Sequence, residues 1–340
     1  MKRRAIAWPW AVMGHKVGGK VMMEANVHGN DGVQSLIMPP RSPLVMRVQD
    51  LLVLSKARVV SMLVFAAAVG EVLAPGFRQH WLAALAALAG IAFAGGAGGV
   101  INQLVEPELD QHMNRTHRRP LVDGRIGRAQ AAGFAGILMA LSVAILWWGT
   151  NELTLVLTLL GTVGYGVVYT LYLKPATPWN IVWGGLAGAL PPLIGWVAVS
   201  DRIEAMPLWL VALVFAWTPA HFWPLAISCR EDYAKACVPM LPVTHGVERT
   251  RREVVRYAVA TLLVSLVPAY LAHDWIYGAA ALVTGVWYLA MTLRLRRMHE
   301  GPEMDRYARR VFAVSISYLF ILFAALILGH FVQTSGLLKI

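Results

Sequence analysis

Apolar runs of about 20 residues without an interior charge recur along the chain, and each is long enough to cross the hydrocarbon core of a bilayer. Only 14% of the residues are charged, against roughly a quarter in soluble domains, so this composition excludes an ordinary soluble protein. We predict an all-α polytopic membrane protein. Its nine predicted spans are residues 50–73, 80–104, 129–148, 152–173, 179–200, 207–227, 254–272, 275–293 and 311–330.

The 30 lysines and arginines divide unequally between the two sides of this predicted bundle. On the side that holds the N-terminus lie 27 of them, and the other side holds only Arg78, Arg202 and Lys339. Because Lys and Arg are enriched in cytoplasmic loops, we expect the N-terminus in the cytoplasm and the C-terminus outside. A net charge of +11 would suggest a nucleic-acid partner for a soluble protein, but in a membrane protein the position of the charges along the chain is more informative, and no nucleic-acid partner is expected.

The first 45 residues differ in composition from the rest of the chain. They contain Gly, Pro and mixed charge without a long apolar run, so they lack the pattern of a signal peptide. We predict a disordered cytoplasmic extension over residues 1–45 and a nine-helix membrane domain over residues 46–340. Cys229 and Cys237 lack the spacing of a metal site and are interpreted as packing residues.

A dense polar segment, NQLVEPELDQHMNRTHRRP, follows the second predicted span and opens what we call the first polar loop (residues 105–128). Asn102, Glu106 and Asp110 are spaced so that a continuous helix would place them on one face. Pro107 is expected to kink or end the span and to open a new short turn. Carboxylate and amide oxygens at a membrane boundary form a site suited to Mg²⁺.

Arginines follow these oxygens at positions 115, 118 and 119. The guanidinium group is always charged and matches the geometry of phosphate. Acids, metal and arginines together can bind a diphosphate and stabilise it as a leaving group. The alternative is a solvated charged loop that only obeys the positive-inside rule.

A second polar loop (residues 228–252) lies on the same predicted side, after the sixth span. It offers Arg230, Glu231, Asp232, Tyr233 and Lys235 as a second metal or diphosphate half-site. More basic residues on this side are Lys56, Arg58 and Lys174. Snorkelling of their side chains to the membrane surface is the alternative explanation for these three.

Two further groups lie inside predicted spans. His221 is a candidate heme-type ligand, and a hydrogen-bonded packing residue is the equal alternative. Tyr165, Tyr169 and Tyr172 could shield a carbocation by cation–π attraction, or could be interfacial tyrosines of the kind that mark the membrane surface.

The run NQLVEPELDQHMNRTHRRPLVDGRI resembles the first aspartate-rich motif of the UbiA superfamily of intramembrane prenyltransferases. Its flanks are similar to those of the branch that farnesylates heme, and three other stretches agree with that branch. These are LSKARVVSMLVFAA, WNIVWGGLAGALPPLIGWVAVS and HFWPLAISCREDYAKACVPMLPVTHG. The resemblance covers the chain from about Leu51 onward.

The chain also departs from the pattern of these relatives. Glu106 stands where Asp is usual, Ala57 stands where Pro is usual, and Cys237 stands where Gly is usual. Pro107 is a further departure. The second acidic motif is degenerate because Asp232 is not followed by an Asp at position 236.

The resemblance implies a fold of nine helices around a central cavity in a bacterial inner membrane. It implies transfer of a farnesyl group from farnesyl diphosphate to a vinyl group of heme B with addition of water, a step toward heme A for cytochrome oxidase. Heme A synthase and oxidase assembly proteins are the implied protein partners.

The resemblance also implies a role for each candidate site residue. Mg²⁺ would be held by Asn102, Glu106, Asp110 and Asp232. The diphosphate would be bound by Lys56, Arg58, Arg115, Arg119, Lys174 and Lys235. Tyr169 would face the allylic cation, and His221 would contact heme.

Other functions fit the sequence less well. A related enzyme acting on a quinone or chlorophyll precursor would share the acids but would not be expected to carry PPLIGW or HFW. A CDP-alcohol phosphotransferase would need an Asp-x₂-Asp-Gly-x₂-Ala-Arg run that the sequence lacks. A transporter would place its charges or broken helices at the membrane midplane, whereas here they gather at one edge. A non-catalytic membrane scaffold would leave the acids and arginines unexplained.

Overall fold

The computed structural model describes residues 43–335, which contain helices and no strand. Residues 1–42, most of the predicted extension, lie outside the described residues. The helices are α1 (Pro43–Leu54), α2 (Ala57–Leu73), α3 (Trp81–Val105), α4 (Pro107–Gln111), α5 (Arg128–Gly149), α6 (Glu152–Val163), the π-helix η1 (Gly164–Leu173), α7 (Lys174–Ala176), α8 (Asn180–Ala189), α9 (Pro191–Ser200), α10 (Ala205–Ser228), α11 (Arg230–Lys235), α12 (Leu241–Thr244), α13 (Gly246–Ser265), α14 (Val267–Ala272), α15 (Trp275–Arg297) and α16 (Pro302–Ser335).

Nine membrane spans are present among the described residues if a bent pair of helices is counted as one span. Eight continuous or joined helices are long and apolar enough to cross a bilayer. The ninth is Met46–Leu54 together with Ala57–Leu73, which meet at an angle of 57°. The prediction of nine spans is confirmed in this sense, and the all-helical fold class is confirmed.

Several spans are irregular in ways that their hydropathy does not indicate. The fourth span passes from α6 through η1 into α7, and the fifth is divided between α8 and α9 where Pro191 begins the second helix. The last helix, α16, has 34 residues and begins nine residues before the predicted span at 311. Its first turns are charged, so they extend the helix beyond the apolar segment.

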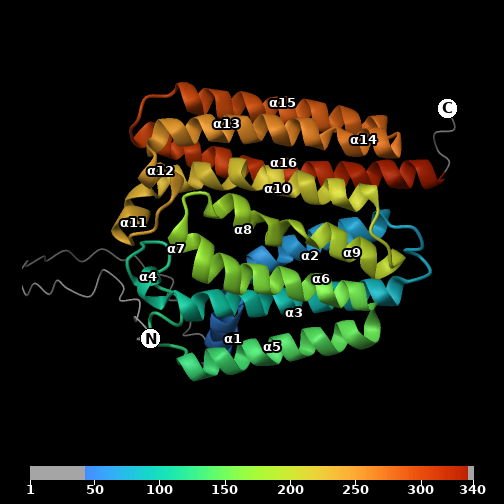
Figure 1. Ribbon diagram of the computed structural model, residues 1–340, viewed down its shortest axis with the longest axis horizontal. Coiled ribbons are helices and arrows are strands. Elements are labelled where there is room, and N and C mark those ends of the chain that lie inside the picture. The colour runs from blue at the N-terminus through green and yellow to red at the C-terminus, as the bar shows by residue number, and fades with distance from the viewer. Residues whose placement is uncertain (1–42, 336–340) are drawn as a thin grey trace, which may run out of the picture. The chain divides into compact units, whose positions relative to one another are not determined.

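The long helices lie side by side in Figure 1, and the short helices α4, α7, α11 and α12 gather at one end of the bundle. Helix α3 packs on α5, and α2 packs on α9. On the other side of the bundle α10, α13, α15 and α16 pack together. Helix α10 also contacts α8 and α9, so it joins the two groups of helices.

The contact between α2 and α9 depends on two glycines. A Cβ atom at Gly195 would lie 2.1 Å from the carbonyl oxygen of Ala67, and one at Gly70 would lie 1.9 Å from that of Pro192. No side chain fits between these backbones. Glycine is therefore required at both positions for the two helices to approach this closely.

We predict that Gly195→Ala lowers the free energy of unfolding by about 3 kcal/mol, because the new methyl group must push α2 and α9 apart. Thermal melting of the purified protein in detergent measures the loss. Gly133→Ala is the matched control, since a Cβ atom at Gly133 meets nothing within 4 Å. Equal melting temperatures for the two variants would contradict the close contact.

Candidate active site

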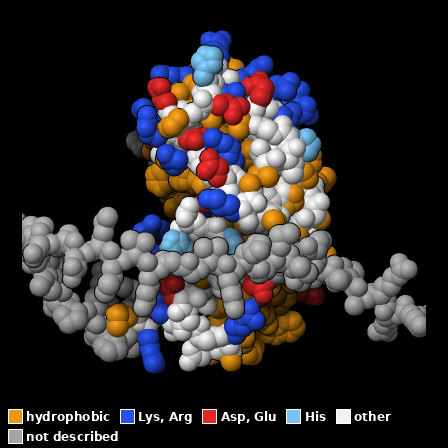
Figure 2. All heavy atoms as spheres, turned by 90° about the vertical axis from the view of Figure 1, so that its left-hand side faces the viewer, with side chains coloured by type: hydrophobic (Ala, Val, Ile, Leu, Met, Phe, Trp, Pro, Cys, Tyr) orange, Lys and Arg blue, Asp and Glu red, His pale blue; other side chains and the backbone are white. Residues whose placement is uncertain are grey.

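The end of α3 is organised by Pro107. Helix α3 ends at Val105, Glu106 lies between the helices, and Pro107 is the first residue of α4. Proline suits this position because the first helical residues have no intrahelical partner for their N–H groups. The predicted interruption and short new turn are confirmed. Figure 2 shows Lys, Arg, Asp and Glu side chains gathered over the end of the molecule where α4 lies.

Lys56 and Asn102 meet directly, although 46 residues separate them in the sequence. The Lys56 Nζ donates to Asn102 Oδ1 over 2.5 Å and to the hydroxyl of Tyr165 over 2.7 Å. The Asn102 amide nitrogen in turn donates to Thr170 Oγ1 over 3.2 Å. Helix α3, the break before α2 and the π-helix are thereby joined at one point.

The two carboxylates that follow Asn102 are each paired with a cation. Lys174 Nζ lies 2.6 Å from Glu106 Oε2, and Arg119 Nη1 lies 2.5 Å from Asp110 Oδ2. Both carboxyl groups are buried, with side-chain exposures of 7% and 3%. Buried charges require such partners, because an unpaired charge in a low-dielectric interior is costly.

The second polar loop lies against the first. Asn114 Nδ2 donates to Asp232 Oδ1 over 2.9 Å, and Met113 packs in one buried cluster with Tyr233. Arg230 forms an ion pair of 2.6 Å with Asp305 at the start of α16. The two polar loops, predicted to be counterparts from the sequence, are therefore in direct contact.

Three predicted diphosphate ligands remain unpaired among the described residues. Arg58, Arg115 and Lys235 have exposed side chains without a hydrogen bond or ion pair in the part of the chain described. The positive charge of Arg115 acts on the neighbouring Tyr233 hydroxyl. Burial raises the pKa of Tyr233 above its ordinary value, and the charge of Arg115 opposes that rise. Arg115 thus lies near the second polar loop.

Tyr165 and Tyr169 form an aromatic pair beside these charges. Their rings stack with centroids 5.8 Å apart, and Tyr165 also accepts the Lys56 contact described above. A Cβ atom at Gly184 would lie 2.2 Å from the Tyr169 ring. Because glycine has no side chain, the Tyr169 ring can lie against the backbone of α8 at this position. Both tyrosines belong to η1, and π-helical turns occur frequently at functional sites. Tyr172 is 65% exposed and does not belong to this pair.

His221 lies in a different environment. Its ring is stacked between Trp217 and Phe312, with centroid distances of 4.1 and 4.4 Å. Its Nδ1 is 2.6 Å from the hydroxyl of Ser315 on α16. The contacts of His221 are therefore those of the α10–α16 interface and not those of the acidic cluster.

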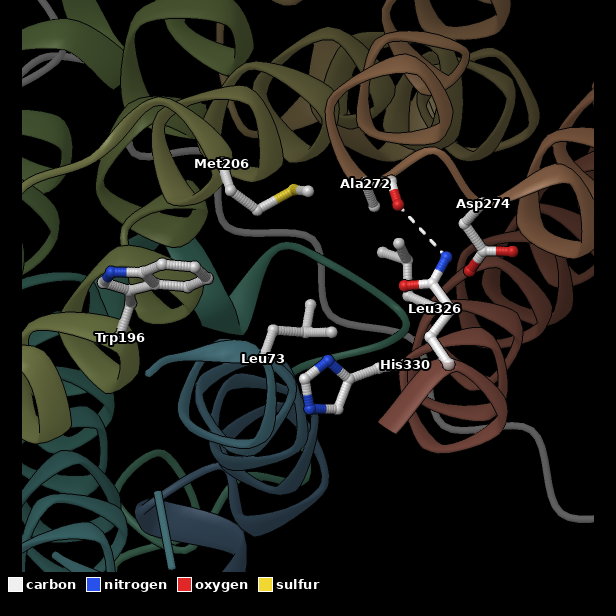
Figure 3. A pocket seen from close by; sticks show the side chains of 8 residues that line it. Leu73, Trp196, Met206, Ala272, Asp274, Leu326 and His330 are labelled. Atoms are coloured by element: carbon white, nitrogen blue, oxygen red, sulfur yellow. Dashed lines mark hydrogen bonds between the residues drawn. The ribbon is translucent and has the colours of Figure 1, made fainter. Parts of the chain in front are cut away.

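A cavity of about 210 Å³ lies elsewhere, lined by the C-terminal residue of α2 and by residues near the C-terminus of α16. In Figure 3, Leu73, Trp196 and His330 surround it on one side, and Asp274 approaches from another. It includes none of the predicted site residues. The residues predicted from the sequence to carry the chemistry lie at the polar loops, away from this cavity.

The donor atoms at the polar loops can be tested for their fit to Mg²⁺. Among residues 43–335, no three His, Cys, Asp or Glu side chains lie close enough together to hold a metal ion. Asn102, Glu106 and Asp110 do supply buried oxygen donors, and each of the three already binds a positively charged group. Because Mg²⁺ usually binds one or two carboxylates together with water and substrate phosphate, these residues fit a magnesium–diphosphate complex better than an ion held by protein alone.

Sequence reasoning alone did not assign several residues of this cluster. Gln103, Asn114 and Thr170 were not singled out, and Tyr165 was not distinguished from Tyr172. The position of Gln103 beside Asn102 was an available signal. Nothing in the sequence indicates that Asn114 would reach the second polar loop, because that contact joins residues 118 positions apart.

Comparison with known proteins agrees with this architecture. The model of the UbiA prenyltransferase family matches residues 63–316. Protoheme IX farnesyltransferase of Marinobacter nauticus is 46% identical over 285 residues, which are 84% of this chain and 93% of that protein. Its counterpart of the same name from Thioalkalivibrio sulfidiphilus is 45% identical over 282 residues, 82% of this chain and 92% of that protein.

Solved structures share the fold at lower identity. The match to a structure of digeranylgeranylglyceryl phosphate synthase covers 84% of this chain and 98% of the synthase chain. The TM-score of this match is 0.68, and the sequence identity is 18%. A UbiA homolog from Archaeoglobus fulgidus bound to GPP and Mg²⁺ matches 82% of this chain and 99% of its own. That match has a TM-score of 0.57 at 19% identity.

We predict that Lys174→Met destabilises the protein by about 3 kcal/mol, because it leaves the buried Glu106 carboxylate without its partner. Thermal melting in detergent measures the change. The double variant E106Q/K174M is expected to recover most of the loss, since neither charge then remains buried. Lys235→Met is the control on an exposed, unpaired lysine, and a comparable loss in that variant would contradict the prediction.

We also predict that Cys237→Gly stabilises the protein by about 1 kcal/mol. Cys237 has a φ of +52°, in the left-handed region that glycine adopts without a steric cost. The resemblance found in the sequence leads us to expect glycine at this position, in agreement with this conformation. Cys229 has a φ of −112°, so Cys229→Gly should give no such gain in melting temperature.

Proposed function

Because the chain belongs to the UbiA prenyltransferase family and is a membrane-embedded prenyltransferase, we propose that it farnesylates heme. The substrates are farnesyl diphosphate and protoheme IX (heme B), and the products are heme O and diphosphate. Identity of 46% over most of its length to a protoheme IX farnesyltransferase supports this choice of acceptor. The PPLIGW and HFW blocks, which favoured a heme-specific branch, agree with this choice.

One observation carries the chemical part of the proposal. Asn102, Glu106 and Asp110 each bind a cationic side chain, and these cations come from three different segments of the chain: Lys56, Lys174 and Arg119. A diphosphate brings several negative charges to such a place. Its arrival can replace the carboxylates as the partners of the lysines and the arginine, while the freed carboxylates can bind a metal ion.

The diphosphate is bound by six basic residues in this proposal. Three of them, Lys56, Lys174 and Arg119, are already held beside the acids. The other three, Arg58, Arg115 and Lys235, have exposed side chains that are free to close on an anion. Guanidinium groups suit this task because they bind phosphate oxygens in pairs.

Mg²⁺ is the proposed cofactor, held by Asn102, Glu106 and Asp110 with Asp232 as a contact from the second polar loop. The metal would neutralise charge that develops on the departing diphosphate. The Archaeoglobus fulgidus relative with a diphosphate ligand and Mg²⁺ supports a divalent ion in this fold. Glu106 retains the carboxylate of the usual Asp, and its pairing with Lys174 indicates that the longer side chain still reaches the cluster.

The reaction begins with heterolysis of the bond between C1 of the farnesyl group and the diphosphate oxygen, which takes the electron pair. The heme vinyl group then donates its π electrons to the allylic cation and forms the new carbon–carbon bond. Water adds to the resulting cation and loses a proton, giving the hydroxyethylfarnesyl group. Tyr169, stacked on Tyr165, is proposed to stabilise the allylic cation with its ring face and to exclude water from it.

His221 is proposed to contact heme near the α10–α16 interface, where its ring is stacked with Trp217 and Phe312. The polar loops are proposed to face the cytoplasm of a bacterial inner membrane, with the C-terminus on the outer side. Enzymes that oxidise the heme O product to heme A, and proteins that assemble cytochrome oxidase, are the proposed downstream partners.

The test is to express the protein in membranes and to analyse the extracted hemes by mass. Heme that gains the mass of a farnesyl group plus water, in a reaction that stops when divalent ions are chelated, is the expected result. Asp110→Asn should lower the rate by about 100-fold or more, because it removes a charge from the site. Asp201→Asn is the matched control on an exposed aspartate of the α9–α10 turn and should retain full activity.

Two results would contradict the proposal. Unchanged heme accompanied by farnesylation of a quinone precursor would assign the protein to another branch of the family. Full activity of Asp110→Asn would exclude the proposed metal and diphosphate site even if heme were farnesylated.

A further inference from the structure

The first membrane span is broken at the residue that reaches the active site. Helix α1 ends at Leu54, α2 begins at Ala57, and the two helices meet at 57°. Lys56 has a φ of +53° and a ψ of +44°, a left-handed conformation that is unfavourable for a residue with a side chain. Some other group must therefore hold the break in place.

Gln103 on α3 supplies that group. Its Nε2 donates to the carbonyl oxygen of Leu54 over 2.6 Å and lies 3.3 Å from that of Val53. The Val53 carbonyl also accepts from the Lys56 N–H over 3.1 Å. The Leu54 carbonyl is left without a helical donor because the helix stops, and Gln103 supplies one. Gln103 is thus a side-chain cap supplied by a neighbouring helix.

The side chain that forms the cap is buried. Gln103 is 1% exposed, and its Oε1 is buried without a hydrogen-bond partner in the described part of the chain. Burying that oxygen costs free energy, and the bonds from Nε2 to α1 offset part of the cost.

Gly99, one helical turn before Gln103, brings α3 close to the same break. A Cβ atom there would lie 3.0 Å from the carbonyl oxygen of Ser55 and 3.4 Å from Lys56 Cγ. The backbone of α3 therefore supports the break on one side while Gln103 binds its carbonyls. A larger residue at position 99 would displace Ser55 or Lys56.

We propose that Gln103 is a positioning residue for prenyl transfer, which acts by holding the α1–α2 break so that Lys56 reaches Asn102 and Tyr165. The inference rests on the proposed function, in which Lys56 binds the diphosphate. Without the cap, the Leu54 carbonyl must find another donor. Rotation of the backbone at Ser55 and Lys56 would satisfy it and would withdraw the ammonium group from the site.

The test measures binding of farnesyl thiolodiphosphate, a slowly reacting analogue, to purified protein with Mg²⁺ by calorimetry. Gln103→Met keeps the length of the side chain and removes the donor, and it should weaken binding about tenfold. Lys56→Met should weaken binding at least as much. The double variant K56M/Q103M should bind no more weakly than K56M alone, because Gln103 acts through Lys56.

A second variant acts on the same break without touching Gln103. Gly99→Ala should displace Lys56 and weaken binding of the analogue, again with no further effect in the K56M background. Gln130→Met is the matched control, because Gln130 also caps a helix end, by accepting from the Gly127 N–H over 3.1 Å. Gly133→Ala controls for the added methyl group, and both controls should bind as the wild type does.

The positioning role would be overturned if the losses of binding free energy in K56M and Q103M added up in the double variant. It would also be overturned if Q103M and G99A bound the analogue with unchanged affinity. Wild-type protein that fails to bind the analogue would instead overturn the proposed function, and this inference with it. Wild-type binding with unchanged affinity in Q103M overturns this inference alone. The two failures can therefore be told apart in one experiment.

Discussion

A bilayer supplies no water to the backbone, so each N–H and C=O group within it must find a partner inside the protein. Breaks in membrane helices are therefore tolerated only where other groups satisfy them. Two of the breaks in this chain lie at the site: the turn at Lys56, capped by Gln103, and the end of α3, where Pro107 begins a new helix. These interruptions bring Lys56 and the carboxylates of Glu106 and Asp110 to the boundary of the bundle. Unbroken helices would instead distribute these groups along their length.

Ion pairs between buried acids and distant cations are the second feature that shapes the site. Glu106 and Asp110 are buried, and each is paired with a cation from a segment that follows it in the chain. These pairs contribute little net stability by themselves, because desolvation offsets much of their attraction. They do fix where the segments lie relative to one another. The pair of Lys174 with Glu106 ties the end of the π-helix to the start of α4, and the bond between Asn114 and Asp232 joins the two polar loops.

Hydropathy was sufficient to predict the nine spans, because in a membrane protein a long run without charges can form little other than a membrane-spanning helix. The break at Pro107 was also predictable, since proline acts locally on the backbone. The partners of the acids were not. Lys174 lies 68 residues from Glu106, and only tertiary packing decides that this lysine, and not an exposed one such as Lys235, reaches the carboxylate. The π-helix also escaped prediction, because its sequence is as apolar as an ordinary span.

The glycine contacts between α2 and α9 have a consequence for the size of the interior. Side chains can change rotamer to widen a space, but Gly70 and Gly195 place backbone directly against backbone. At that depth the separation of the two helices is fixed, and no rearrangement of side chains can enlarge it. A space between α2 and α9 at this depth could therefore open only if the two backbones moved apart as a whole.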